Sequence, residues 1–357
     1  MPRYLLHVGP HKTGTTYLQL RFDAARQRLR QSGVVYPSEW SSAEGEPSHR
    51  KLVVGLREAH VAQLRSQFEA IERDDPDDVL ISAEGIGHLQ PPALELLKTL
   101  MRAQPVTVIF YCRRWSELLP SLWQERVKHG HDETFPEFFS INASDPFESI
   151  EMNFTRRLDA YAKVFGRENI RLVSYNNLCD AGIDLAEHFF DCFLPQHRSL
   201  IDGLPHLPVA RPNQSLPPLD IEVIRALNAF NARGGMPVSS ALRDWYMTKS
   251  GQFDLAGLFA AIQTNAATLP FSDATPAVRL LQDSLSATYG DVMVQPAQPG
   301  CLFAPRKAEI VYFRQRYLTD RMARDALDKV YAAFRREVHS EPEGAVGPVV
   351  GGAAASR

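Results

Sequence analysis

The sequence predicts an α/β fold in three layers, with a central parallel sheet between helices and a largely helical second half. Short apolar runs bounded by turn residues recur along the first half of the 357-residue chain, and such runs are typical of strands buried in a parallel sheet. Amphipathic stretches long enough for helices separate these runs. Strands that alternate with helices pair in parallel, because each helix carries the chain back across the sheet.

The first strand is expected over Tyr4–Val8, where residues of strand-forming character end at a glycine. Polar residues with spaced leucines then predict a helix over Thr16–Gln31. A short extended piece follows at Val34–Tyr36, and the polar run Ser38–Ser48 is expected to form a surface loop. Apolar residues spaced by three to five positions predict one helix over His49–Arg73.

Three further strands are expected after that helix. Each is short, apolar and bounded by residues that favour turns, and they cover Val79–Glu84, Val106–Tyr111 and Ile170–Tyr175. The helices expected between them cover Pro91–Arg102, a segment that begins near Trp115 and ends at Gly130, and Phe154–Phe165.

The pattern changes beyond Phe193. A proline-rich loop is expected over Pro195–Pro218, and helices follow from Leu219, over Leu255–Ile262, over Pro276–Tyr289 and over Tyr317–Val338. The chain therefore divides into an α/β core over residues 1–200, a mostly helical region over 201–340 and a tail over 341–357. Glycines and alanines predict that this tail is disordered.

The bulk composition excludes several classes of protein. A net charge of −3 lacks the basic excess of nucleic-acid-binding domains. The first residues form too short an apolar run for a signal peptide, and no segment approaches the roughly 20 apolar residues of a spanning helix. The four cysteines lack metal-ligand spacing. We therefore expect a cytoplasmic protein that binds no nucleic acid and needs no metal.

The main candidate for a binding site is the stretch Lys12-Thr13-Gly14-Thr15-Thr16, between the first strand and the first helix. Glycine lets the backbone approach a ligand, and the first amides of the helix point their N–H groups at it. With the helix dipole and a nearby ammonium group, these amides make a phosphate site. A Walker A loop has its lysine directly after the second glycine, whereas here Lys12 precedes Gly14.

A second candidate lies where the strand Val106–Tyr111 leads into Arg113 and Arg114. Ser121 follows Arg113 by eight positions, about two turns along the next helix. A guanidinium group offers paired donors to a phosphate, and a hydroxyl group adds one more. This pair is therefore a second place for a phosphate.

These motifs resemble those of sulfotransferases that use 3′-phosphoadenosine 5′-phosphosulfate (PAPS). In that family Lys-Ser/Thr-Gly-Thr-Thr follows the first strand, and an Arg and a Ser eight residues apart follow a central strand. The likeness, which is to bacterial members, covers residues 4–193 and includes the segment Tyr161–Leu178. Many members carry Pro directly before the lysine, whereas this chain has Pro10 and then His11.

The resemblance implies a P-loop-like fold and a role for each motif. The residues implied to hold the 5′-phosphosulfate of PAPS are Lys12, Thr13, Gly14, Thr15 and Thr16. Arg113 and Ser121 are implied to hold the 3′-phosphate. Lys12 is also implied to act in catalysis, because its ammonium group neutralises charge on the leaving oxygen.

Transfer to a hydroxyl group also needs a base. Glu84 is the first candidate, because a carboxylate at the carboxyl end of a parallel strand lies where α/β proteins bind ligands. His88 and His11 are the alternatives. An apolar strand that ends in an acidic residue is equally typical of a magnesium-binding Walker B segment.

Three other residues near the motifs are expected to be structural, and one later loop is a candidate for nucleotide contact. His7, Trp115 and Trp123 are expected to pack in the core. The loop Arg211–Ser215 falls where a late loop returns to the nucleotide in related enzymes, and it is a further candidate for nucleotide contact.

The resemblance thus implies transfer of a sulfuryl group from PAPS to a hydroxyl group or amine of an acceptor, such as a carbohydrate or another small metabolite. The region 201–340 is expected to provide the acceptor site. Two alternatives remain: a P-loop kinase-like phosphotransferase, which would need magnesium, and a non-catalytic nucleotide-binding protein.

Overall fold

The computed structural model describes residues 2–41, 47–202, 216–294 and 302–340. Within these ranges the chain forms two compact units that interleave along the sequence. The first takes its residues from Met1–Leu118, Asp145–Gln214 and Asp273–Arg306, and the second from Leu119–Ser144, Ser215–Ser272 and Lys307–Arg357. The expected disordered tail, 341–357, and the candidate loop, 211–215, lie outside the described residues.

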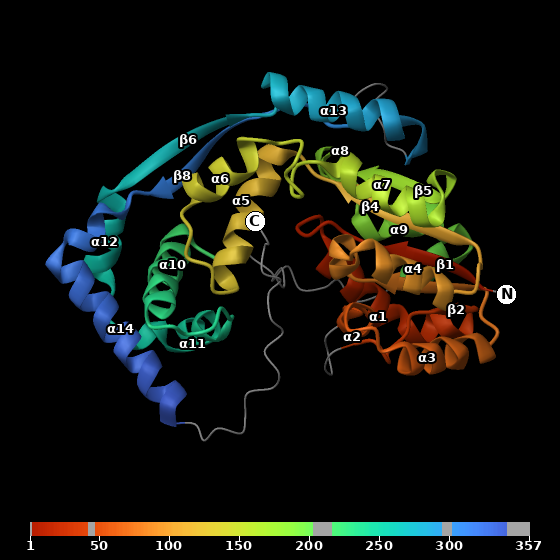
Figure 1. The fold of residues 1–357 in the computed structure, drawn as a ribbon, viewed down its shortest axis with the longest axis horizontal. Helices are drawn as coiled ribbons and strands as arrows, with labels where there is room; N and C mark the ends of the chain where they lie inside the picture. Colours follow the sequence, from red (N-terminus) through yellow and green to blue (C-terminus); the bar gives the residue numbers. More distant parts are fainter. Residues whose placement is uncertain (1, 42–46, 203–215, 295–301, 341–357) are drawn as a thin grey trace. The chain divides into compact units, whose positions relative to one another are not determined.

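A six-stranded parallel sheet forms the first unit, which confirms the α/β prediction (Figure 1). Its strands are β1 (Arg3–His7), β2 (Val34–Val35), β3 (Asp78–Ser82), β4 (Val106–Cys112), β5 (Ile170–Ser174) and β7 (Met293–Val294). Their spatial order is β2-β3-β1-β4-β5-β7. The strand predicted to end at Glu84 ends at Ser82 instead, and Glu84 opens a 3-10 turn, η1 (Glu84–His88).

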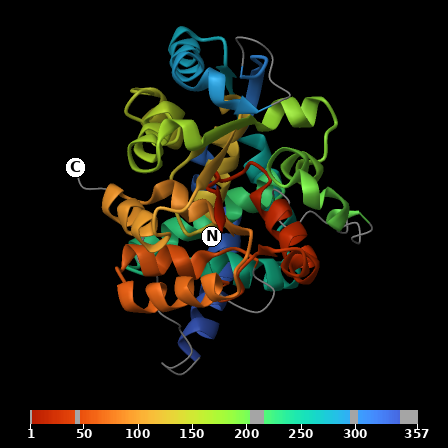
Figure 2. The ribbon, with the colours of Figure 1, turned by 90° about the vertical axis from the view of Figure 1, so that its right-hand side faces the viewer.

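Helices flank both faces of this sheet (Figure 2). The helices of the first unit are α1 (Thr15–Gln31), α2 (Arg50–Arg57), α3 (Val61–Arg73), α4 (Pro91–Leu100), α7 (Phe154–Phe165), α8 (Tyr175–Asp180), α9 (Leu185–Phe193) and α13 (Pro276–Tyr289). Side chains alternate between the two faces of a strand, so Leu5 packs in one apolar cluster with α1 and α9. Tyr4, its neighbour, lies against Phe68 of α3.

The second unit is mostly helical, as predicted for the second half. Its helices are α6 (Phe135–Ala143), α10 (Pro218–Arg233), α11 (Ala241–Lys249), α12 (Ala256–Thr264) and α14 (Arg321–Ser340). Helix α5 (Trp115–Lys128) begins in the first unit and continues into the second. A two-stranded antiparallel ribbon of β6 (Ala266–Ser272) and β8 (Lys307–Phe313) joins these helices.

The single helix predicted over His49–Arg73 is wrong, because the structure breaks it into α2 and α3. Ala59 has a φ of 54°, in the left-handed region that a helix does not use. The backbone N–H of His60 donates to the carbonyl of Gly55 at 2.8 Å, which closes α2. Neither glycine nor proline stands at this break, so the sequence gives no local signal for it.

The run Ser38–Ser48 is not a surface loop throughout. Trp40 is fully buried, and its ring centroid lies 4.8 Å from that of Phe68; residues 42–46 lie outside the described chain. The predicted loop Pro195–Pro218 begins with a 3-10 turn, η3 (Pro195–Ile201). The ribbon strand β8 was missed by the prediction, although its residues Ile310 to Phe313 are β-branched or aromatic.

Candidate functional site

Three of the predicted site segments meet at the carboxyl ends of β1, β3 and β4. His7 at the end of β1 pairs in register with Ser82 of β3 and with Ile109 of β4. The chain places β3 on one side of β1 and β4 on the other, so this is the point where the strand order reverses. Open α/β sheets bind ligands in the crevice outside such a point.

The loop after β1 has an unusual backbone held from within. Gly9, Lys12 and Gly14 all have positive φ, at 90°, 68° and 77°. The Thr13 hydroxyl donates to the carbonyl of Pro10 at 2.8 Å, and this side chain is fully buried. Thr13 therefore fixes the loop through its side chain.

Gly14 is required by its surroundings as well as by its φ. A Cβ atom built there would lie 2.3 Å from Leu185 Cδ1 of α9. Gly14 is the N-cap of α1, and it makes no side-chain cap hydrogen bond because it has no side chain. The first turn of α1 also carries no acidic residue, so its amide end keeps the positive potential that favours an anion.

Arg113 reaches this loop from the end of β4. Its Nη1 donates to the carbonyl oxygen of Lys12 at 2.5 Å, and its guanidinium carbon lies 5.3 Å from the ring centroid of Tyr175. Burial is the main cause that raises the pKa of Tyr175 to about 12, so the phenol is neutral at pH 7. The Nε of Arg113 is buried without a hydrogen-bond partner among the described residues. Arg113 therefore has a donor to offer beside the loop.

Arg114 has a different role from its neighbour. Its side chain is fully buried, and it donates to Glu117 Oε1 at 2.9 Å and to Asp180 Oδ2 at 2.6 Å. Its backbone N–H donates to Asn176 Oδ1 at 2.7 Å. Arg114 is thus a structural residue that joins α5 to α8.

Glu84, His11 and His88 form one group beside the loop. The Nδ1 of His11 lies 2.5 Å from Glu84 Oε2. The ring of His11 stacks on that of His88, with centroids 5.4 Å apart and planes 29° apart. Burial, followed by the nearby charges of Arg157, His11 and Arg57, lowers the pKa of His88 to about 3, so His88 is neutral at pH 7.

A buried cluster of polar side chains joins the carboxyl ends of β1 and β3. His7 is fully buried, as expected for a core residue, and its Nδ1 lies 2.8 Å from Ser82 Oγ. Gln19 of α1 donates to the same oxygen at 3.2 Å, and the Ser82 N–H donates to His49 Nδ1 at 3.2 Å. Burial lowers the pKa of His7 to about 4 and that of His49 to about 3. The prediction from sequence missed His49, since only the folded chain brings it to β3.

Ser121 lies in the second compact unit, further along α5, and its side chain is partly buried. Its pairing with Arg113 at a 3′-phosphate stays a prediction. Trp115 is fully buried, and its indole N–H donates to the carbonyl of Met152 at 2.9 Å, so it packs in the core as expected. Trp123 is also buried, within the second unit.

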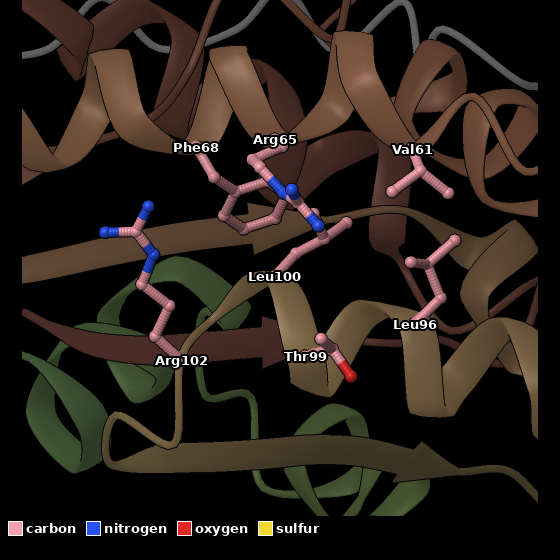
Figure 3. A pocket seen from close by; sticks show the side chains of 7 residues that line it. All are labelled: Val61, Arg65, Phe68, Leu96, Thr99, Leu100 and Arg102. Atoms are coloured by element: carbon pink, nitrogen blue, oxygen red, sulfur yellow. The ribbon is translucent and has the colours of Figure 1, made fainter.

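A small cavity of the first unit lies elsewhere, between α3 and α4 (Figure 3). It measures about 70 Å³ and is lined by Val61, Arg65, Phe68, Leu96, Thr99, Leu100 and Arg102. A second hollow of about 380 Å³ is lined by Arg171, Cys192, Phe193, Asp291, Val292, Met293 and Val294. Neither contains a residue of the predicted site.

Within the described ranges, no helix is long and apolar enough to cross a membrane. Across the same residues, no group of three or more His, Cys, Asp or Glu side chains has the arrangement of a metal site. The chain matches no protein-family model, no curated protein and no solved structure.

Proposed function

We propose that this protein is a sulfotransferase that moves a sulfuryl group from PAPS to a hydroxyl group or amine of a small acceptor. One observation carries the proposal: the loop Lys12–Thr16, the Glu84–His11 pair and Arg113 meet at the carboxyl edge of β1, β3 and β4. The first supplies an anion site, the second a base and the third a further cation. These are the groups that sulfuryl transfer requires.

The residues at this edge fit a nucleotide bearing phosphate groups. Gly14 leaves room where a Cβ atom would collide with Leu185, and as the N-cap of α1 it makes no side-chain cap hydrogen bond of its own. The buried Nε of Arg113 has no partner among the same residues and suits an oxyanion. Lys12 to Thr16 would hold the phosphosulfate of PAPS, and Arg113 with Ser121 would hold its 3′-phosphate.

The donor supplies an activated sulfuryl group whose leaving group is a phosphate. Lys12 stands at the loop, and its ammonium group would stabilise the negative charge that grows on the leaving oxygen. That charge exists only as the bond breaks, so Lys12 acts on the transition state more than on binding. The Glu84–His11 pair would accept the proton of the acceptor.

A P-loop kinase is the rival enzyme class, and the order of the loop argues against it. Lys12 comes before Gly14, whereas the Walker A lysine follows its glycine. Glu84, which would be a base in the sulfotransferase and a magnesium ligand in the kinase, is paired with His11. We therefore expect turnover to survive chelation with EDTA; loss of turnover on chelation would favour the kinase.

A ligand panel tests the proposed function directly. Adenosine 3′,5′-bisphosphate should raise the melting temperature more than ATP or 5′-AMP does, because a bound ligand stabilises the folded state by mass action. Each charge-assisted hydrogen bond contributes about 1.5–3 kcal/mol, so the bisphosphate should bind at least about tenfold better than 5′-AMP.

The matched variants are Arg113→Ala and Arg30→Ala. Arg30 is an exposed arginine that pairs with Asp74, so its loss controls for the removal of a positive charge. Arg113→Ala should abolish the preference for the bisphosphate, and Arg30→Ala should keep it. Equal affinity of the wild type for the two nucleotides would remove the case for the 3′-phosphate site. Binding of the bisphosphate without any turnover of PAPS would favour the non-catalytic alternative.

A further inference from the structure

The short contact between His11 and Glu84 decides which nitrogen of the imidazole carries a proton. The Nδ1 of His11 lies 2.5 Å from Glu84 Oε2. An ionised carboxylate can only accept hydrogen bonds. Nδ1 must therefore carry the hydrogen, and in the neutral ring the lone pair belongs to Nε2.

In this arrangement one residue accepts the proton and the other orients it. A carboxylate that holds one ring nitrogen fixes the tautomer and orientation of the imidazole, and it stabilises the imidazolium ion that forms when the other nitrogen takes a proton. Glu84 already uses Oε2 for His11. Side-chain exposure is 35% for His11 and 23% for Glu84, so the imidazole is the more accessible member of the pair.

The charged and titratable groups around the stacked rings of His11 and His88 come from four segments. Lys12 is its neighbour in the loop, and Glu84 and His88 belong to η1. Arg57, at the end of α2, and Arg157, in α7, both act electrostatically on His88. His88 itself is neutral at pH 7 and offers a flat ring against which His11 stacks. Glu84 is thus the group in this set that favours a protonated His11.

We infer that His11 is the catalytic base of this site, through Nε2, and that Glu84 is the residue that positions it. The inference rests on the proposed function and assigns the base within the pair. The proton of the acceptor hydroxyl passes to His11 Nε2 while the acceptor oxygen forms its bond to sulfur. The bond from sulfur to the bridging phosphate oxygen breaks, and adenosine 3′,5′-bisphosphate leaves with the electron pair beside Lys12.

Asparagine and glutamine substitutions separate the two roles. His11→Asn keeps an N–H donor near the position of Nδ1 and removes the base, whereas Glu84→Gln removes the charge and keeps the shape. Release of adenosine 3′,5′-bisphosphate from PAPS is measured with water as the acceptor, over a range of pH. The control is His60→Asn, because His60 forms an exposed pair with Glu58 at 3.2 Å in the same unit.

His11→Asn should lower turnover by about 10²–10⁴, the usual contribution of a general base, while the affinity for the bisphosphate stays near the wild-type value. Glu84→Gln should cost less, and the acid limb of its pH profile should move to lower pH because the imidazolium ion has lost its carboxylate. The double variant should be no slower than His11→Asn, since the two residues act as a unit. His60→Asn should match the wild type.

A second acceptor gives an independent readout. The 4-nitrophenolate ion arrives already deprotonated, so transfer to it should be nearly insensitive to His11→Asn. Histidine nitrogen NMR of the wild type should also show a hydrogen on Nδ1 of His11, assigned by the signal lost in His11→Asn.

Three results would overturn the inference. In the first, His11→Asn is nearly as active as the wild type, turnover of Glu84→Gln falls by about 10² or more, and the acid limb of the pH profile lies near the ordinary carboxylate value of about 4. Glu84 would then be the base, and the proposed sulfotransferase function would still stand. If the wild type binds no adenosine 3′,5′-bisphosphate, the proposed function fails and the inference fails with it. Protonation of His11 on Nε2 alone would contradict the pairing itself.

Discussion

Substitution of Gly14 by alanine tests the feature on which the loop depends. The backbone there has a φ of 77°, and the new Cβ atom would lie 2.3 Å from Leu185 Cδ1 and 3.3 Å from Tyr175 Cε2. A non-glycine residue in the left-handed region costs about 1–2 kcal/mol. Forcing an extra methyl group into a packed site costs about 1–3 kcal/mol more. We therefore expect Gly14→Ala to lower the free energy of unfolding by about 2–5 kcal/mol.

Gly182→Ala separates these two contributions. Gly182 also has a positive φ, 67°, but a Cβ atom there would meet nothing within 4 Å. Its substitution should cost only the conformational part, about 1–2 kcal/mol. Denaturation with urea measures both variants, and the affinity for adenosine 3′,5′-bisphosphate should fall in Gly14→Ala alone.

The double variant Gly14→Ala/Leu185→Ala completes the cycle. Leu185→Ala removes the atom that the new methyl group would strike, so the two changes should cost less together than the sum of their separate costs. If Gly14→Ala lowers the free energy of unfolding no more than Gly182→Ala does, α9 does not approach the loop closely, and the proposed clash between residue 14 and Leu185 is refuted.

Two further predictions concern charge. Lys12→Ala should lower the turnover of PAPS more than it weakens binding of adenosine 3′,5′-bisphosphate. Single-turnover kinetics and a binding titration measure the two effects. Unchanged turnover would show that Lys12 has only a structural role. Acid should destabilise the fold below pH 6.5, down to about pH 4 through His7 and about pH 3 through His49, because the pKa values of these histidines are lowered to about 4 and about 3 in the folded state. The unfolded chain then binds more protons, so each histidine contributes stability that is complete above pH 6.5 and falls by about 1.4 kcal/mol per pH unit below it. Urea denaturation across this range checks the slope, which His49→Gln should reduce and substitution of the exposed His60 should not.

The sheet could be predicted from sequence because its strands are short, apolar and separated by amphipathic stretches. β4 illustrates the reason: it consists mainly of β-branched and aromatic residues, and most of its length is buried. The turn into α1 was equally visible, since Gly14 stands between a strand and a helix. Local chemistry sufficed at these places.

Other features depend on contacts between residues far apart in sequence. The partner of His11 is Glu84, and each residue taken alone was a candidate base; the pairing follows from β1 and β3 being neighbours. The break between α2 and α3 occurs at Ala59, a residue that favours helices. The ribbon of β6 and β8 joins segments that are separated by α13. No local periodicity reveals such pairings.

The choice between Arg113 and Arg114 shows how folding assigns a role that chemistry alone leaves open. Both follow β4, and both meet Glu117. Arg114 is buried and bonds Glu117 Oε1 at 2.9 Å, whereas Arg113 lies 3.5 Å from Oε2, an oxygen that already accepts from Asn176 at 2.9 Å. To bind Arg113, an anion at the loop would have to replace only this longer contact with Glu117. To bind Arg114, it would have to replace short bonds to two carboxylates. Arg113 also donates to the backbone carbonyl of Lys12, so a phosphate held by Arg113 would act directly on the loop that contains Lys12.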